Sequence, residues 1–160
     1  MNQVYLLIGG NIGDREFYLS EACKTIEKNC GRIARRSFLY ETEAWGLKEQ
    51  SPFLNQALEV WTELPPEEML DCLLKAETQL GREREVKYGP RLIDIDIIFY
   101  NDLVINSQNM KIPHPEMQNR RFVLQPLFEI APDVVHPILN KSVRQLLQEC
   151  TDALKVNKFN

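Results

Sequence analysis

Two aspartates, Asp94 and Asp96, stand in an otherwise apolar stretch that runs from Leu92 to Tyr100. Alternate residues of a strand point to the same face of a sheet, so the two carboxylates project together and the intervening isoleucines take the other face. Carboxylates this close repel each other unless a cation lies between them. Magnesium prefers oxygen ligands and completes its shell with water and substrate phosphates. The pair therefore indicates a magnesium site, and the alternative is an acidic face paired to basic neighbours.

A basic segment leads into this strand. Its cations are Arg82, Arg84, Lys87 and Arg91. Arginine binds phosphate oxygens through two parallel hydrogen bonds, so two acids beside several arginines favour a site for a metal–polyphosphate. The alternative is a solvated loop whose cations neutralise the acids directly. Gly81 and Gly89-Pro90 indicate a loop that can move.

Further candidate residues flank the strand in sequence. His114 lies between two prolines and precedes Arg120 and Arg121, a cluster suited to phosphate. Phe53 and Asn55 share one face of their predicted strand. Aromatic rings can stack on a flat heterocycle, and an amide can donate and accept along its edge, although phenylalanines are more often plain core.

The glycine-rich segment 9–14 reads Gly-Gly-Asn-Ile-Gly-Asp. This pattern matches neither the dinucleotide fingerprint nor a Walker P-loop. We expect a tight turn from strand to helix, and we expect any nucleotide to bind elsewhere.

The elements that must position these residues follow from hydrophobic periodicity and from Gly and Pro punctuation. The predicted elements are a strand at 4–8, a helix at 15–29, a strand at 32–43, a strand at 53–64, a helix from Pro65, a strand from 92, a return toward Val104-Ile105, an apolar stretch at 122–130 and a helix near 142–150. The order strand, helix, strand, strand, helix, strand predicts an α+β, ferredoxin-like βαββαβ fold. Its helices lie on one face of a mainly antiparallel sheet, and the C-terminal part is an addition.

Composition sets limits on the remaining possibilities. The chain has 160 residues and a net charge of −4, which suggests a single domain at 1–160 and gives no support to nucleic-acid or membrane binding. The four cysteines are scattered, so we expect reduced, buried thiols rather than a disulfide framework or a zinc site. No targeting segment or membrane span is visible, and we expect a cytoplasmic protein.

Together these residues resemble the 6-hydroxymethyl-7,8-dihydropterin pyrophosphokinase family of the folate pathway. The resemblance lies in Lys-x-Gly-Pro-Arg-x-x-Asp-Ile-Asp-Ile-Ile from Lys87 to Ile98, and it extends to Pro-His at 113–114, Asn-Arg at 119–120, Pro-Phe-Leu-Asn at 52–55 and the segment 9–14. It implies transfer of the β,γ-pyrophosphoryl unit of ATP to the pterin hydroxymethyl group, with release of AMP. It also implies a monomer whose partners are these small molecules.

The resemblance also implies a role for each candidate residue. Asp94 and Asp96 would hold two magnesium ions, and Arg82 and Arg91 would neutralise charge on the transferred group. The implied contacts to ATP are Lys75, Glu77, Arg84, Ile97, His114 and Arg120. The implied contacts to the pterin are Phe53, Asn55, Phe122 and the backbone of Thr42 and Trp45. The loops at 9–14, 44–52 and 81–91 would close over the site.

Two other classes of protein are consistent with parts of the pattern. A ferredoxin-like regulatory or RNA-binding module would share the fold, but an RNA-binding version needs paired aromatic motifs and a basic face, and neither is visible. Another magnesium-dependent nucleotide enzyme, such as a nuclease or cyclase, would share the acidic pair. The products formed from ATP separate these possibilities.

Overall fold

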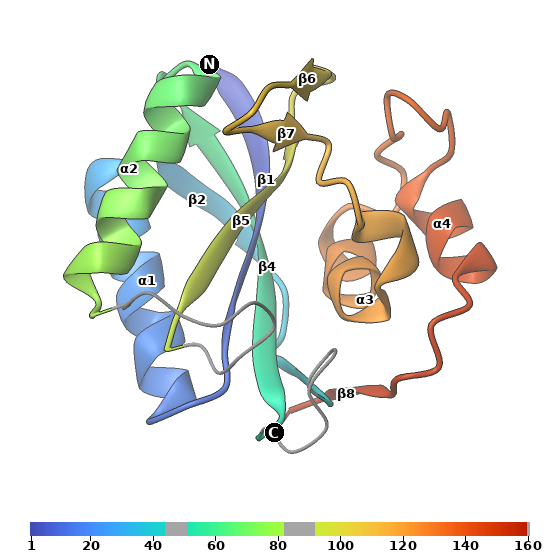
Figure 1. Cartoon of the computed structure of the whole chain (residues 1–160), viewed down its shortest axis with the longest axis horizontal. Coiled ribbons are helices and arrows are strands. Elements are labelled where there is room, and N and C mark those ends of the chain that lie inside the picture. The colour runs from blue at the N-terminus through green and yellow to red at the C-terminus, as the bar shows by residue number, and fades with distance from the viewer. Residues whose placement is uncertain (44–50, 82–91, 160) are drawn as a thin grey trace.

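A computed structural model describes residues 1–43, 51–81 and 92–159 (Figure 1). The strands are β1 (Asn2–Gly10), β2 (Arg32–Arg36), β3 (Tyr40–Thr42), β4 (Phe53–Thr62), β5 (Asp94–Tyr100), β6 (Ile105–Asn106), β7 (Lys111–Ile112) and β8 (Val156–Lys158). The helices are α1 (Arg15–Asn29), α2 (Pro66–Gln79), the 3-10 turn η1 (Met117–Asn119), α3 (Arg121–Ile130) and α4 (Val143–Glu149).

The main sheet has the order β5-β1-β4-β3-β8, and β2 also pairs with β4. Every pairing within it is antiparallel. With β2 and β3 counted together as the second strand of the motif, this order is that of a ferredoxin-like βαββαβ unit. The predicted fold class is therefore confirmed.

Helices α1 and α2 cover one face of the sheet, where they pack on side chains such as Leu6 of β1 and Leu58 of β4. Helix α1 begins where predicted, because the Asp14 carboxylate accepts a hydrogen bond from the Phe17 amide at 3.1 Å. Helix α2 begins with Pro66, which lacks the amide hydrogen that a first turn leaves unsatisfied.

The opposite face is covered by α3 and α4, which lie across the sheet from α1 and α2 in Figure 1. Tyr5 and Leu7 of β1 pack there with Val123 and Leu127 of α3 and with Leu146 of α4. The expectation of helices on one face holds for α1 and α2 only. Alternate residues of β1 are apolar on both faces, so the sheet needs a second layer, and the C-terminal segment supplies it.

The predicted second strand, 32–43, forms two strands. Residues 37–39 separate β2 from β3, whereas only residues 56 and 57 lie opposite them in β4. The extra residue is accommodated at Ser37, whose hydroxyl accepts a hydrogen bond from the Ala57 amide at 2.9 Å. The two strands keep one partner but shift register, as at a β-bulge.

The C-terminal segment differs in detail from its prediction. Residues 105–106 pair with 111–112 rather than returning along β5. The predicted helix near 142–150 is confirmed as α4, where Ser142 and Gln145 form a reciprocal capping box. Strand β8 was not predicted; it adds to the edge of β3.

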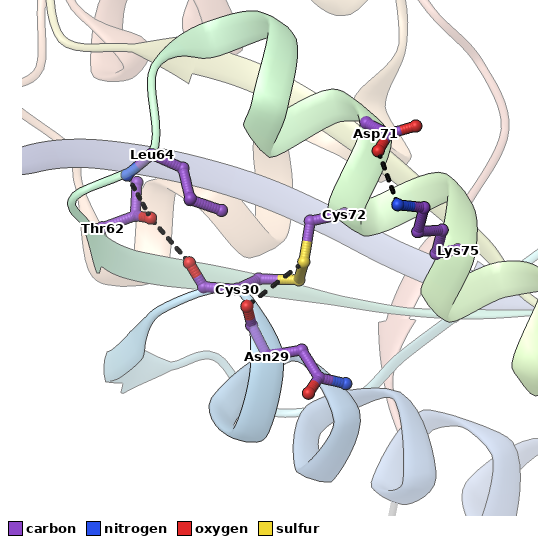
Figure 2. The surroundings of a disulfide bond; sticks show 7 residues. All are labelled: Asn29, Cys30, Thr62, Leu64, Asp71, Cys72 and Lys75. Atoms are coloured by element: carbon purple, nitrogen blue, oxygen red, sulfur yellow. Dashed lines mark hydrogen bonds and ion pairs between the residues drawn. A yellow bond between two sulfur atoms is a disulfide. The ribbon is translucent and has the colours of Figure 1, made fainter.

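The expectation of reduced thiols is wrong for one cysteine pair. Cys30, at the end of α1, and Cys72, in α2, form a disulfide with their Cα atoms 6.0 Å apart (Figure 2). The Cys30 carbonyl is also held by the Thr62 hydroxyl at 2.6 Å. The cysteines are 42 positions apart, which concealed this proximity in the sequence. Disulfides are uncommon in cytosolic proteins. The expectation of reduced thiols therefore no longer supports a cytoplasmic location. Among the described residues, Cys23 and Cys150 are free.

No helix in the described part of the chain is long and apolar enough to span a membrane.

Candidate active site

Asp94 and Asp96 lie at the start of β5, half-buried, on the face of the sheet that α3 also covers. The intervening Ile95 and the following Ile97 point the other way and pack in the core beneath α1 and α2. The sequence prediction that the two carboxylates share a face is consistent with this arrangement. Their isoleucine neighbours anchor the strand, which fixes where the carboxylates project.

The neighbouring strand β1 ends beside this pair in glycine. Gly9 lies opposite Asp94 in β5 and opposite Asn55 in β4, so it stands between these two polar residues. A Cβ atom added to Gly9 would lie 2.1 Å from the Asn55 side-chain oxygen. The absence of a side chain at Gly9 therefore makes room for the Asn55 amide. Sequence reasoning missed this role, because it placed Gly9 in the loop rather than in the strand.

Asn55 is buried in β4, only 4% exposed. Its Nδ2 group has no hydrogen-bond partner among the described residues. A buried amide donor without a partner costs free energy, which a ligand acceptor can recover. The position of Asn55, across Gly9 from Asp94, fits the edge of a polar heterocycle.

Phe53 and Thr42 face each other where β4 begins and β3 ends. Phe53 is half-buried, whereas Thr42 is buried and its hydroxyl donates to the Lys155 carbonyl at 2.8 Å. The Thr42 side chain thus anchors the segment leading into β8, and the Thr42 backbone lies between β4 and β8. Trp45 lies outside the described residues.

The residues just before β4 are bound to the turn that follows β1. The Asn11 side-chain amide donates to the Ser51 carbonyl at 2.9 Å, and the Arg15 guanidinium donates to the Pro52 carbonyl at 3.0 Å. Arg15 also pairs with Glu41 at 2.6 Å. A cavity of about 420 Å³ lies beside these groups. The expected strand-to-helix turn is present at 11–14, where Gly13 has a φ of +67°.

His114 lies alongside β5, where its backbone amide donates to the Ile98 carbonyl at 3.0 Å. Burial, and then the charge of Arg120, lower the pKa of His114, while Asp94 and Glu116 oppose the shift. The Nδ1 atom accepts a hydrogen bond from the Glu116 amide at 3.2 Å. The proton of the neutral imidazole is therefore on Nε2, which leaves an N–H group to donate to an anionic ligand.

Arg120 directly precedes α3, and its guanidinium carbon lies 5.9 Å from the centroid of the Phe122 ring. Phe122 is half-buried at the edge of the α3 core. An arginine and an aromatic ring therefore stand together at the start of α3, with His114 within electrostatic reach of both Arg120 and Asp94.

Three predicted nucleotide contacts lie away from this face. Lys75 is on the exposed side of α2 and pairs with Asp71 at 2.9 Å. The Ile97 side chain is in the core beneath α1 and α2. Glu77 is buried in α2 and accepts a hydrogen bond from the Ile95 amide at 2.6 Å. The structure thus does not bring these three side chains onto the face of the sheet that carries Asp94 and Asp96.

The predicted phosphate contacts Arg82, Arg84 and Arg91 lie outside the described residues. So do Lys87 and most of the loops expected to close over the site.

The donor set at the aspartates fits magnesium. Within the described ranges, no group of three or more His, Cys, Asp or Glu side chains could hold a metal. Two carboxylates alone make a poor zinc site, but they suit a magnesium ion that takes its other ligands from water and phosphate.

Comparison with known proteins gives a consistent result. Residues 5–132 match the family model described as 7,8-dihydro-6-hydroxymethylpterin-pyrophosphokinase. The chain is 42% identical over 151 residues to a 2-amino-4-hydroxy-6-hydroxymethyldihydropteridine pyrophosphokinase of Aquifex aeolicus, and the match covers 94% of each chain. The enzyme of the same name from Bacillus subtilis is 42% identical over 134 residues, which are 83% of this chain and 80% of the relative.

Some relatives are longer proteins. The chain is 47% identical over 131 residues to the bifunctional protein FolKE of Lactococcus lactis, and the match spans 81% of this chain but 38% of the relative. In structure it resembles Plasmodium falciparum HPPK-DHPS crystallised with STZ-DHP, with a TM-score of 0.74 at 20% identity. That match covers 92% of this chain and 43% of the other, and it supports the fold alone.

Proposed function

The chain belongs to the 7,8-dihydro-6-hydroxymethylpterin-pyrophosphokinase family, and we infer from this membership that it transfers pyrophosphate to hydroxymethyldihydropterin in folate biosynthesis. ATP is the co-substrate, and the products are AMP and the pterin diphosphate. A regulatory module or a nuclease would not account for a family match that spans most of the chain. The observation that carries the assignment is this match together with the cross-strand placement of Asn55, Gly9 and Asp94.

We propose that Asp94 and Asp96 hold magnesium, with two ions expected. When bound, the metal neutralises phosphate charge and lowers the pKa of the attacking hydroxyl. The role of the chain is to present both carboxylates on one face of a strand whose other face is fixed in the core. Transfer of this kind depends mainly on positioning and on charge stabilisation, so no protein base is required.

We propose that the pterin lies beside Asn55 at the ends of β1 and β4. The unpartnered Nδ2 of Asn55 supports this placement, because the pterin ring offers acceptors along its edge. Phe53 and Phe122 would stack on the two faces of the ring, and the backbone of Thr42 and Trp45 would complete the pocket.

We propose that the triphosphate is bound by His114 and Arg120 from the described part of the chain and by Arg82, Arg84 and Arg91 from the preceding loop. The neutral Nε2–H tautomer of His114 supports a donor role toward phosphate oxygen. Arg82 and Arg91 would neutralise charge on the transferred group. Lys75 and Ile97 remain predictions as nucleotide contacts, whereas the bond from the Ile95 amide to Glu77 favours a different role for that residue.

The remaining expectations are a monomer in the cytoplasm, with no nucleic-acid partner, and a single pyrophosphokinase domain at 1–160. The pairing of β8 with β3 supports the single domain, because it joins the end of the chain to the same sheet. Sedimentation of the purified protein tests the monomer.

Product analysis tests the proposed reaction. The protein is incubated with magnesium, ATP and 6-hydroxymethyl-7,8-dihydropterin, and the nucleotides are separated. We expect AMP in equal amount to the pterin diphosphate. ADP as the product would rule out pyrophosphoryl transfer, and the absence of turnover would favour a binding module.

A further inference from the structure

We propose that Glu77 is a positioning residue that holds the two aspartates in place through the backbone of β5, rather than through a direct contact with substrate. The inference rests on the proposed function, since it assigns to Glu77 a role toward the magnesium ligands. It is carried by one contact, the 2.6 Å hydrogen bond from the Ile95 amide to the Glu77 Oε2 atom.

Ile95 lies between the two proposed magnesium ligands, Asp94 and Asp96. A bond to its amide therefore fixes the backbone on which both carboxylates are mounted. Successive amide groups of a strand point to opposite edges. Since the Ile95 amide bonds to Glu77, this alternation directs the amides of Asp94 and Asp96 toward the paired strand β1. The Ile95 amide points the other way and donates to the Glu77 side chain of α2.

This backbone needs support because β5 is at the edge of the sheet order. An edge strand has hydrogen-bond partners on one side only and frays more readily than a central strand. Metal ligands must be held to within about 0.5 Å of their working geometry. A bond from a rigid helix to the amide between the two ligands meets that requirement.

The burial of Glu77 supports a specific role. Its side chain is 3% exposed, and it lies among apolar residues of α2 such as Leu73 and Ala76. A carboxylate is rarely buried to this extent unless its charge is satisfied by strong hydrogen bonds. A bond from an amide to an ionised acceptor is stronger than one to a neutral acceptor. The chain thus keeps a carboxyl group where an apolar residue would pack more easily.

Amide hydrogen exchange of the ligand-free protein tests the first step. We compare wild type with Glu77→Met, which keeps an unbranched side chain and helix propensity but removes the acceptor. The quantity measured is the exchange rate of the Ile95 amide relative to that of Leu6 in the central strand β1. We expect this ratio to rise about 10-fold to 100-fold in Glu77→Met, as the loss of a hydrogen bond to a charged group implies. Glu77→Gln, with a neutral acceptor, should lie between Glu77→Met and wild type.

Leu73→Ala is the matched control. Leu73 is buried one turn earlier in α2 and makes no side-chain bond to β5, so its truncation loosens the core without removing the bond to Ile95. The Ile95 to Leu6 ratio should stay as in wild type. An equal rise in Leu73→Ala would show that the Glu77 effect is general destabilisation, and would overturn the proposal.

Magnesium dependence tests the second step. We measure the magnesium concentration that half-saturates binding of a non-hydrolysable ATP analogue, which requires no turnover. It should rise several-fold in Glu77→Met and less in Glu77→Gln, while the affinity at saturating magnesium changes little. If Glu77→Met does not fold, Glu77→Gln alone carries the test, and identity with wild type in both measurements overturns the proposal.

Other outcomes also decide against it. Unchanged Ile95 exchange with weaker binding of the analogue at saturating magnesium would indicate a direct nucleotide contact instead. Faster exchange with unchanged magnesium dependence would make Glu77 a purely structural residue. None of these results depends on the reaction, so failure of the proposed function appears separately, as a wrong product in the AMP assay.

Discussion

Gly9 separates Asn55 from Asp94 across three neighbouring strands, and a Cβ atom at Gly9 would lie 2.1 Å from the Asn55 Oδ1 atom. The proposed pterin donor and the proposed metal ligand therefore lie on either side of a residue that has no side chain. This relationship links two halves of the proposed site that are 39 positions apart in the sequence.

Gly9→Ala should weaken binding of the dihydropterin by about tenfold, because the new methyl group displaces the Asn55 amide from its position. Calorimetry in the presence of a non-hydrolysable ATP analogue measures the affinity. Gly31→Ala is the control, since its Cβ would lie 2.5 Å from the Trp61 carbonyl, also in a crowded place. It should lower stability and leave pterin affinity unchanged. Equal pterin affinity in Gly9→Ala and wild type would contradict the placement of Asn55.

Asn55→Asp should also lower pterin affinity by about tenfold or more, because the substitution keeps the size of the side chain but removes its Nδ2 donor. The same calorimetric titration checks it. Gln56→Glu offers a matched comparison, since Gln56 also loses an amide donor, in this case the 2.9 Å bond to the Ser37 carbonyl. We expect Gln56→Glu to retain pterin binding, and a similar loss in both variants would argue against a specific contact at Asn55.

The stability of the protein should fall below about pH 6.5 through His136, whose pKa is lowered by burial. Its Nδ1 atom accepts hydrogen bonds from the Ile138 amide at 3.2 Å and from the Leu139 amide at 3.1 Å, so the folded state holds the neutral form. As the pH falls below the ordinary pKa, the unfolded chain binds a proton first, and the free energy of unfolding decreases.

Urea unfolding across this pH range measures the effect. His136→Asn keeps an acceptor near the two amides but cannot titrate, and its stability relative to wild type should improve as the pH falls. The pKa of His114 is lowered as well, so part of the fall in stability should remain in His136→Asn. The double variant His114→Asn/His136→Asn should lose that remaining part. A stability difference between wild type and His136→Asn that does not vary with pH would refute this account.

Reduction of the Cys30–Cys72 disulfide should lower the free energy of unfolding by about 3–4 kcal/mol, as expected for a loop of 42 residues. Denaturation of the wild type with and without reductant measures this, and Cys72→Ser should behave like the reduced protein. Cys150→Ser is the control, because Cys150 is free.

Thiol counting in denaturant should give two thiols before reduction and four after it, of the four cysteines in the chain. Four thiols before reduction would show that the bond is not formed.

Much of the fold was predictable because local signals agree with it. Helix α1 has its predicted bounds, 15–29, since Asp14 caps its first turn and Gly31 follows its end. The antiparallel core followed from the order of strands and helices. The division of strand 32–43 was not predictable, because it depends on one extra residue opposite β4 and on the hydroxyl of Ser37.

The site was predictable where its residues share one strand and less so where they do not. Asp94 and Asp96 could be placed on one face from a period of two residues. The hydrogen bond from Ile95 to Glu77 and the bond between Cys30 and Cys72 join elements that only the folded chain brings together. The sequence near Gly9 does not indicate that its missing side chain makes room for Asn55, because Asn55 lies in the neighbouring strand β4.

The most direct test of the account is the rate of AMP formation by wild type, Asp94→Asn and Asp96→Asn, measured with magnesium, ATP and the hydroxymethyldihydropterin. Each variant keeps the size of its side chain but loses a charged magnesium ligand. We predict that both stay folded, as judged by circular dichroism, and lose at least about 100-fold in rate, since the metal supplies several kcal/mol of charge stabilisation. AMP formation at the wild-type rate in both folded variants would contradict the assignment of the metal site.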